Sequence, residues 1–408
     1  MRVLRTSKTS RVIGASALLC AVVGATTGAA AATKEGPRAT TPQPRWGGAA
    51  RLHAGQLLTA EPLQTAAALP SAASTQLITY ISDDAQGEPV VVSGTVAIPK
   101  TKPPRGGWPV ISWAHGTSGY ADVCAPSNDT VDGLDHDYFA VIDPTLDAWV
   151  ARGYVVVQTD YEGLGTPGPH PYLNGVSEAN TVIDIVRAAR HLSPSVGRNW
   201  AVMGHSQGGQ AALFAAQLAG ARAPELNLRA AVPIAPGGTF VEQTVPYIQS
   251  AQPGAAAAEA FLPLILLGAQ AADPSINAET LVSDAFGPAM TAARTGCLAQ
   301  LRAVTPIDPS TVFRPGADVT ALDAYLAQQD PLATDPKVPT LIAQGTADTL
   351  VAKPSTDILV KTLCGKGAAI QYDVYQGQDH RGTVAASLAD AENFVYTAMQ
   401  GHTPPTNC

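Results

Sequence analysis

A serine stands between two glycines in residues 204–208, which read Gly-His-Ser-Gln-Gly, and its flanking sequence gives it chemical meaning. An apolar run, residues 200–203, comes before it, and an Ala-rich stretch beginning at Gln210 comes after it. This order predicts a strand, a sharp turn that carries Ser206, and a helix. The hydroxyl would then lie above the helix N-terminus, where backbone amides favour developing negative charge. We interpret the segment as a nucleophile elbow; a chance match in a Gly-rich chain is the alternative.

A serine hydroxyl becomes a good nucleophile only when a base takes its proton. In sheets of alternating strands and helices, reactive groups gather in loops at the carboxyl ends of strands. Ser206 follows one predicted strand, Asp348 follows the strand predicted at 338–343, and His380 follows the strand predicted at 370–375. Histidine exchanges protons near neutral pH, and a carboxylate holds its tautomer and stabilises the imidazolium. We therefore expect Ser206, Asp348 and His380 to form a triad.

Position excludes the other histidines and aspartates from these roles. His205 lies inside the elbow and points away from the side of the serine. His191 lies in a predicted helix, and His53 and His402 lie near the ends of the chain. Asp373 lies inside a predicted strand, Asp335 lies before one, and Asp379 is directly beside His380.

An acyl-transfer site also needs two backbone N–H groups that stabilise an oxyanion. One should belong to Gln207, the residue after the nucleophile. The other should come from the loop after the strand predicted near 108–114, which reads His115-Gly116-Thr117. We assign it to Thr117, with Gly116 as the alternative, and we expect His115 to brace the loop.

Two acid-bearing loops could suggest a metal or sugar site. Residues 160–165 contain Asp160 and Glu162 near two glycines, but no histidine or third acid lies close by with ligand spacing, which favours a structural loop. A second cluster is interpreted as a solvated acidic loop rather than a metal site; it contains Asp132, Asp135, His136 and Asp137.

Charge and length exclude some classes of protein. The chain has 408 residues and a formal net charge of −8. Residues 1–32 carry four basic residues and no acid, which leaves −12 for the rest of the chain. An acidic protein lacks the basic face that nucleic-acid binding needs. The composition is that of a soluble globular protein with a large core.

The N-terminus resembles an export signal. Four basic residues precede an apolar stretch at 12–23, and Ala30-Ala31-Ala32 offers a cleavage site. A membrane anchor is the alternative, but the small residues of this segment favour cleavage and a secreted protein. Leu19 stands before Cys20 where lipidation would require a small residue. No other stretch is long and apolar enough to span a bilayer, so we expect no stable membrane anchor.

The pattern after this signal predicts four regions. Residues 33–54 form a flexible leader, and two β-rich runs near 77–98 form an antiparallel pair. From Trp108 strands and helices alternate, which predicts an α/β fold with a mostly parallel sheet flanked by helices. Residues 237–336 contain helical stretches but no clear strand, which predicts an inserted helical cap. Residues 55–236 and 337–408 then form the core. The alternative is that the inserted helices have no role in substrate binding.

Four cysteines remain once the signal is removed, and an even number in an exported protein indicates two disulfides. Cys124 and Cys297 lie on the active face of the fold, the second of them in the cap. Cys364 ends a helix that runs to the opposite face, and the last helix brings Cys408 to the same side. We therefore expect the pairs Cys124–Cys297 and Cys364–Cys408.

Three motifs together resemble the secretory lipase family of α/β-hydrolases, which includes fungal secreted lipases and actinobacterial exported esterases. They are His115-Gly116-Thr117 with Cys124-Ala125-Pro126-Ser127, residues 160–165, and residues 204–209. The resemblance covers the chain from about Gly55 onward. It implies that the triad of the family maps onto Ser206, Asp348 and His380, and its cap onto 237–336. It also implies hydrolysis of acylglycerols or shorter acyl esters, without a metal or cofactor.

Two other functions fit the same residues. A secreted peptidase or amidase could use the same triad, and esters tested against amino-acid anilides would separate the two activities. A binding protein without catalysis is the third reading, and the filled triad positions argue against it.

Overall fold

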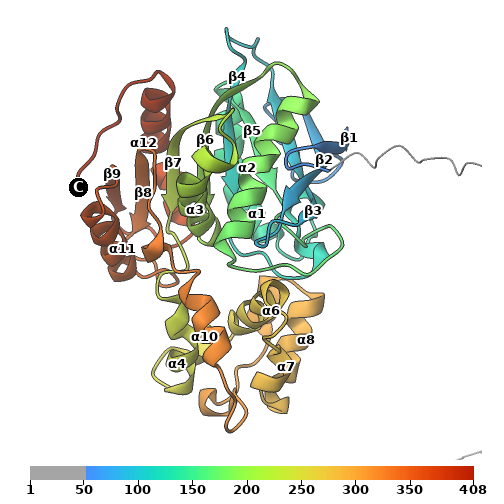
Figure 1. The fold of residues 1–408 in the computed structure, drawn as a ribbon, viewed down its shortest axis with the longest axis vertical. Coiled ribbons are helices and arrows are strands. Elements are labelled where there is room, and N and C mark those ends of the chain that lie inside the picture. The colour runs from blue at the N-terminus through green and yellow to red at the C-terminus, as the bar shows by residue number, and fades with distance from the viewer. Residues whose placement is uncertain (1–51) are drawn as a thin grey trace, which may run out of the picture. The chain divides into compact units, whose positions relative to one another are not determined.

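The structure is a computed structural model that describes residues 52–408, and one nine-stranded sheet forms its centre (Figure 1). The predicted signal, residues 1–32, and nearly all of the predicted leader lie outside the described residues. The strand order is β1-β2-β3-β5-β4-β6-β7-β8-β9. The strands are β1 Leu57–Pro62, β2 Ala72–Asp83, β3 Pro89–Pro99, β4 Trp108–Ala114, β5 Val155–Thr159, β6 Val196–His205, β7 Asn227–Ile234, β8 Thr340–Gly345 and β9 Ile370–Tyr375.

The sheet is mostly parallel, as predicted. The strands from β5 through β4, β6, β7 and β8 to β9 are parallel to their neighbours, whereas β1, β2 and β3 form an antiparallel edge that joins the sheet at β5. Strands β5 and β8 are buried along their whole length because helices cover both faces of the sheet. The carboxyl ends of the parallel strands therefore meet at one edge.

The helices of the core form two layers. On one face α1 (His136–Ala151) and α12 (Gly382–Met399) share a buried apolar cluster with the sheet. On the other face α2 (Gly175–Leu192) and α3 (Gln207–Arg222) pack against each other and the sheet. α11 (Lys353–Gly365) lies beside β8 and β9.

Two helices begin earlier than the sequence predicts, since its pattern indicates one helix at 143–151 and another at 180–192 with Asn180 as its cap. The Asp143-Pro144 pair is typical of a helix start, yet α1 begins at His136 and contains Pro144 in its interior. Tyr138, Phe139 and Ile142 are buried against the sheet, and their burial offsets the hydrogen bond that proline cannot make. α2 is capped by Asn174, whose side chain accepts a hydrogen bond from the Ser177 amide at 2.9 Å, and not by the expected Asn180.

The segment between β7 and β8 is helical and has its own buried apolar cluster. Figure 1 shows it on one side of the sheet, below the strand ends. Its helices are α4 Thr244–Gln249, α5 Ala255–Ala258, α6 Leu262–Ala272, α7 Ala278–Leu281, α8 Gly287–Thr295, α9 Leu298–Ala303 and α10 Thr320–Ala327. Short 3-10 helices complete the chain: η1 Asp122–Cys124, η2 Pro126–Asn128, η3 Val241–Gln243, η4 Asp284–Phe286, η5 Pro309–Thr311 and η6 Pro331–Ala333.

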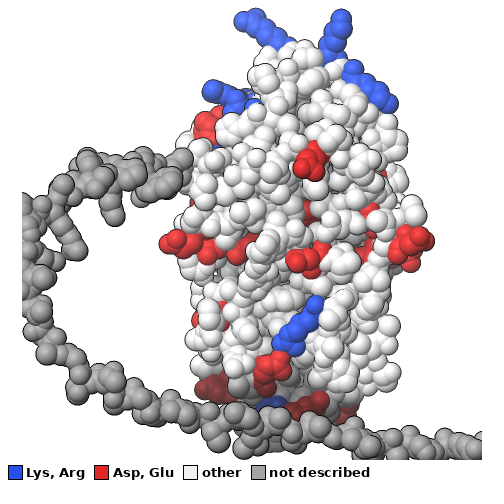
Figure 2. All heavy atoms as spheres, turned by 90° about the vertical axis from the view of Figure 1, so that its right-hand side faces the viewer, with Lys and Arg blue, Asp and Glu red and all other residues white. Residues whose placement is uncertain are grey.

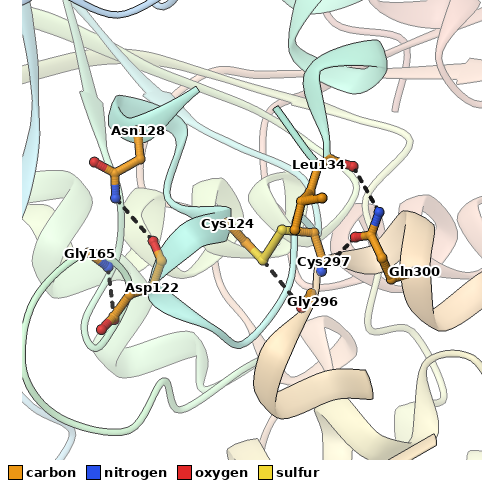
Figure 3. Close-up of a disulfide and its surroundings, with 8 residues drawn as sticks. All are labelled: Asp122, Cys124, Asn128, Leu134, Gly165, Gly296, Cys297 and Gln300. Atoms are coloured by element: carbon orange, nitrogen blue, oxygen red, sulfur yellow. Dashed lines mark hydrogen bonds between the residues drawn. A yellow bond between two sulfur atoms is a disulfide. The ribbon is translucent and has the colours of Figure 1, made fainter. Parts of the chain in front are cut away.

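Two disulfides tie distant parts of the fold together. Cys124 pairs with Cys297 across 173 residues, and Cys364 pairs with Cys408 across 44. Figure 3 shows the first bond joining the loop after β4 to the start of α9. Next to it, the Leu298 amide donates a hydrogen bond to the Ser118 carbonyl at 2.7 Å. The helical segment is therefore fastened to the loop expected to hold the oxyanion.

The surface is sparsely charged. Figure 2 shows a face on which Lys and Arg side chains gather at the end remote from the helical segment, while Asp and Glu side chains are scattered. Within residues 52–408, no helix has both the length and the apolar character needed to cross a membrane.

Candidate active site

Ser206 occupies a tight turn between β6 and α3, with φ at 60° and ψ at −118°. A residue other than glycine rarely adopts a positive φ, so this backbone is strained. The flanking glycines are required by contact: a Cβ on Gly208 would lie 1.9 Å from the Ala114 carbonyl oxygen, and one on Gly204 would lie 2.1 Å from that of Gly208. The Gly-x-Ser-x-Gly spacing thus lets strand and helix cross closely enough to present the serine.

His380 and Asp348 are in direct contact. Nδ1 of His380 donates a hydrogen bond to Oδ2 of Asp348 at 2.8 Å. Asp348 follows β8 and His380 follows β9, so the two adjacent parallel strands bring their loops to the same edge of the sheet. Donation from Nδ1 leaves Nε2 unprotonated and available as a base.

The carboxylate of Asp348 accepts several hydrogen bonds besides the one from His380. Oδ1 accepts the amides of Leu350 and Val351, both at 2.9 Å, and Oδ2 also accepts Nε2 of Gln344 at 3.2 Å. Burial acts to raise the pKa of Asp348, but the hydrogen bond and charge of His380 and the two amides outweigh it and lower this pKa. Asp348 is therefore ionised throughout the neutral range.

A cavity of about 230 Å³ contains the reactive groups. Ser206 and His380 line it, together with Thr117 and Gln207. Its remaining walls include apolar side chains of the helical segment, among them Phe261 and Ile265. The segment between β7 and β8 thus contributes part of the wall above the serine.

The backbone amides of Thr117 and Gln207, which are expected to stabilise the oxyanion, differ from the alternative amide of Gly116 in having no hydrogen-bond acceptor among the described residues. The Gly116 N–H donates to the Tyr138 hydroxyl at 2.7 Å, so it is already engaged. Within residues 52–408 the N–H groups of Thr117 and Gln207 have no acceptor. The Thr117 side chain is fixed by its hydrogen bond to the Tyr172 hydroxyl at 2.8 Å. Of these three amides, those of Thr117 and Gln207 are therefore free to bind an oxyanion.

A chain of hydrogen bonds joins the loop after β4 to His380. The Tyr138 hydroxyl lies 3.1 Å from Nδ1 of His205, and Nε2 of His205 lies 2.9 Å from the carbonyl oxygen of His380. A carbonyl only accepts, so Nε2 of His205 carries the proton and Nδ1 accepts from Tyr138. Burial lowers the pKa of His205 well below its ordinary value, which keeps the ring neutral. His205 lines the same cavity as Ser206 and contacts the backbone of His380.

The Gln207 side chain is held by a buried acid. Nε2 of Gln207 donates to Oε1 of Glu178 at 2.7 Å, and Glu178 also accepts the Leu173 amide. Burial raises the pKa of Glu178 to about 8. His170, also buried, lies 3.5 Å from the same Gln207 nitrogen. These contacts fix the residue that follows the nucleophile.

The other loops singled out in the sequence have structural contacts. Asp160 accepts hydrogen bonds from the hydroxyls of Ser93 and Ser127 and from the Ser127 amide. His115 is buried, and its ring nitrogens lie within hydrogen-bonding distance of the Gly116 and Asp160 carbonyls. Within residues 52–408, no group of three or more His, Cys, Asp or Glu side chains is arranged to hold a metal ion.

The expectation of a solvated acidic loop is wrong for Asp135. That side chain is buried at the start of α1, and burial raises its pKa to about 7. The structure also adds residues that the sequence reasoning missed: Tyr138, Glu178, Arg302 and Arg381. Only Arg381 had a sequence signal, its position directly after His380.

Known proteins that are similar to this chain include lipases and esterases. The family model described as secretory lipase matches residues 140–404, more than half of the chain. Lipase A of Moesziomyces aphidis is 28% identical over 360 residues, which cover 83% of this chain and 74% of that protein.

Solved structures share the fold. The closed state of Candida antarctica lipase A has a TM-score of 0.72 at 23% identity and covers 88% of this chain and 85% of its own. The rice cell wall degrading esterase LipA from Xanthomonas oryzae, in a ligand-bound form, has a TM-score of 0.64 at 22% identity, with 85% of this chain and 97% of its own covered. The predicted α/β-hydrolase fold is confirmed, and the protein is a carboxylic ester hydrolase that belongs to the secretory lipase family.

Proposed function

We propose that this protein is exported and cleaves carboxylic esters through a covalent acyl-enzyme on Ser206. The observation that carries the proposal is the 2.8 Å hydrogen bond between His380 and Asp348, in a cavity that Ser206 also lines. Export is supported by the basic and apolar N-terminal sequence and by the two disulfides, which persist in oxidising compartments.

In the first half of the reaction, Oγ of Ser206 attacks the ester carbonyl while Nε2 of His380 takes its proton. The negative charge that develops on the carbonyl oxygen is stabilised by the amides of Thr117 and Gln207. The imidazolium of His380, held by ionised Asp348, then protonates the leaving alkoxide. An ester now joins Ser206 to the acyl group.

In the second half, a water molecule gives a proton to His380 and attacks the acyl-enzyme. The same amides stabilise the second oxyanion, and the proton returns to Oγ of Ser206 as the carboxylic acid leaves. The apolar walls contributed by the helical segment 237–336 support the interpretation of this segment as a cap that binds the acyl or alcohol part of the ester.

The proposal is tested by replacing Ser206 with alanine and labelling the purified protein with a fluorophosphonate. We expect the wild type to gain one adduct on Ser206 and the variant to gain none and to lose ester hydrolysis. The His191→Ala variant, changed at a histidine on α2 whose ring contacts the Gly55 carbonyl, serves as a matched control that retains labelling. Labelling at another residue, or none in folded wild type, contradicts the proposal.

A further panel separates the esterase from the peptidase reading. Hydrolysis of p-nitrophenyl esters with no hydrolysis of amino-acid p-nitroanilides supports the ester substrate class. Faster cleavage of the anilides would reassign the natural reaction to amides while leaving the triad intact.

A further inference from the structure

Two arginines border the catalytic cavity, and among the described residues neither forms an ion pair with a carboxylate. Arg302 lies on α9, and Arg381 directly follows the base. The cavity lining contains no Asp, Glu or Lys side chain, so these two guanidinium groups supply its permanent charge. The whole chain has a net charge of −8, whereas the side chains that line this cavity carry a net positive charge.

The surroundings of these arginines differ from those of two partly buried arginines elsewhere, Arg187 and Arg222. Arg187 and Arg222 each form ion pairs with Asp184, and each also pairs with a second carboxylate. Within residues 52–408, Arg302 forms no hydrogen bond or ion pair; its guanidinium lies 5.4 Å from the centre of the Phe261 ring. Arg381 lies 5.1 Å from the centre of the Tyr138 ring and donates a 3.4 Å hydrogen bond to a backbone carbonyl. Most of their N–H donors therefore remain available to a ligand.

Three carboxylates share a second hollow with the two arginines but do not line the catalytic cavity. They are Asp132, Asp137 and Asp135. Both guanidinium groups act electrostatically on Asp135. Asp135 forms no ion pair with either arginine among the described residues. Burial raises the pKa of Asp135 to about 7, so near neutral pH its charge is only partly present. Burial and, after it, the positive charge of Arg381 lower the pKa of Arg302, while the charge of Asp135 acts to raise it, so the two guanidinium groups lie close enough to affect each other.

Both arginines are held in place by the framework of the site. Arg302 lies one turn after Cys297, which the disulfide fastens to Cys124 (Figure 3). Arg381 is the neighbour of His380, whose backbone carbonyl is fixed by His205. Two guanidinium groups held near a nucleophile match the forked, charge-assisted recognition of carboxylate or phosphate oxygens.

We propose that Arg302 and Arg381 form an anion subsite, which selects ester substrates that carry a negatively charged carboxylate or phosphate group beyond the scissile ester. This inference rests on the proposed function of the same cavity and adds its substrate class. The anionic group would lie at the rim, against the two arginines, while the ester carbonyl reaches Ser206. Water reaches Arg302, which is exposed, so each contact contributes modestly and depends on ionic strength.

Two matched pairs of esters test the subsite and tell which end of the ester carries the anion. The acyl-side pair is mono-4-nitrophenyl adipate and 4-nitrophenyl 6-methylheptanoate, which replaces the carboxylate with an isopropyl group. The alcohol-side pair is 4-carboxyphenyl butyrate and 4-carbamoylphenyl butyrate. The readout is the ratio of kcat/KM for the charged ester to that for its neutral partner.

We expect Arg302→Gln and Arg381→Gln each to lower this ratio about threefold to fivefold in at least one pair, and the double variant about tenfold. Arg302→Lys should keep the ratio within about twofold of wild type because it keeps the charge. Added NaCl should lower the ratio in wild type and much less in the double variant. Arg294→Gln, on the neighbouring helix α8 and outside the cavity, is the matched control and should leave the ratio unchanged.

The inference is overturned if the ratio in both pairs is the same in wild type and the folded double variant, or if Arg302→Lys loses as much as Arg302→Gln. The neutral esters keep this outcome separate from failure of the proposed function. If wild type cleaves neutral esters through Ser206 but shows no arginine-dependent ratio, only the anion subsite is wrong. If Ser206→Ala cleaves neutral esters as fast as wild type, the proposed function fails.

Discussion

The backbone carbonyl of His380 accepts a hydrogen bond from Nε2 of His205, at 2.9 Å. The two imidazole rings lie 4.4 Å apart, and His205 is itself held by the Tyr138 hydroxyl. Because Tyr138 also accepts the Gly116 N–H, one chain of contacts sets both the oxyanion loop and the base. Three segments far apart in the sequence are thereby fixed relative to one another.

We predict that His205→Leu lowers kcat about tenfold to a hundredfold with little change in KM, because it leaves the buried carbonyl of His380 and the Tyr138 hydroxyl unpaired and loosens the base. His205→Gln, whose side-chain amide can reach the same carbonyl, should recover part of the loss. Tyr138→Phe should show a smaller loss of the same kind. The control is Tyr154→Phe, because the Tyr154 hydroxyl has no hydrogen-bond partner among the described residues. A rise in KM with unchanged kcat in the His205 variants would contradict a positioning role.

A second prediction concerns the tautomer of the base. Asp348→Asn replaces an acceptor with an amide that can present a donor to Nδ1 of His380, so Nε2 would carry the proton and could not accept one from Ser206. We expect kcat to fall about 10³-fold to 10⁴-fold while folding is retained. Asp357→Asn, at a carboxylate on α11 that pairs with Lys353, is the matched control and should retain activity. A loss smaller than tenfold in folded Asp348→Asn would assign the acid to another residue.

The elbow itself can be tested with a pair of glycines on one helix. Gly208→Ala would push a Cβ to within 1.9 Å of a backbone oxygen, so we expect it to prevent correct folding of the elbow and abolish activity. Gly220→Ala lies on the same helix, α3, where a Cβ meets no atom within 4 Å. Alanine is favoured over glycine in a helix interior by about 0.5–1 kcal/mol, so this variant should be slightly more stable and fully active. Thermal denaturation and ester hydrolysis measure both; an active, stable Gly208→Ala would refute the close crossing of strand and helix.

Much of this arrangement could be predicted from the sequence because its signals are local. Ser206, Asp348 and His380 each directly follow a strand, and the alternation of strands with helices predicted which edge they share. The contacts of Tyr138, Glu178 and Arg302 could not be predicted, because they depend on the packing of α1, α2 and α9 around that edge. The start of α1 differs from the predicted one for a related reason. The Asp143-Pro144 pair resembles a helix start, whereas the helix begins at His136 because several residues between them are buried against the rest of the fold. Local patterns thus predicted the three candidate residues, and long-range packing decided what surrounds them.

The raised pKa of Glu178, the buried acid that accepts a hydrogen bond from Gln207, allows a prediction of how the free energy of unfolding depends on pH. Burial raises the pKa of Glu178 to about 8, whereas an unfolded glutamate titrates near 4.3. Between these values the folded protein binds more protons than the unfolded chain, so the free energy of unfolding decreases as pH rises. The buried histidines His115, His170 and His205 have lowered pKa values and act in the opposite direction, but only below about pH 6.5.

Above pH 6.5 the carboxyl groups therefore dominate, and we expect the wild type to lose stability between pH 6.5 and pH 8.5. Glu178→Gln removes one titrating group and keeps an oxygen that can accept the Gln207 and Leu173 donors. It should reduce the loss over this range by about 1–2 kcal/mol. Glu61→Gln, at an exposed position on β1, is the control and should leave the pH profile unchanged. Chemical denaturation at several pH values measures the effect, and identical slopes for Glu178→Gln and wild type would contradict it.

The two disulfides should differ in their contributions to the stability of the fold and to activity. Replacing Cys124 and Cys297 with alanine opens a loop of 173 residues and frees α9 from the loop after β4, whereas replacing Cys364 and Cys408 opens a loop of 44 residues at the C-terminal tail. Loop-closure entropy predicts that the first change destabilises the fold by about 1 kcal/mol more than the second. Because α9 carries Arg302 and adjoins the loop of Thr117, we also expect only the first pair of substitutions to lower kcat/KM. Equal activity in the two double variants, measured below the midpoint of their thermal unfolding, would show that the packing of α9 suffices to hold the cavity without the disulfide.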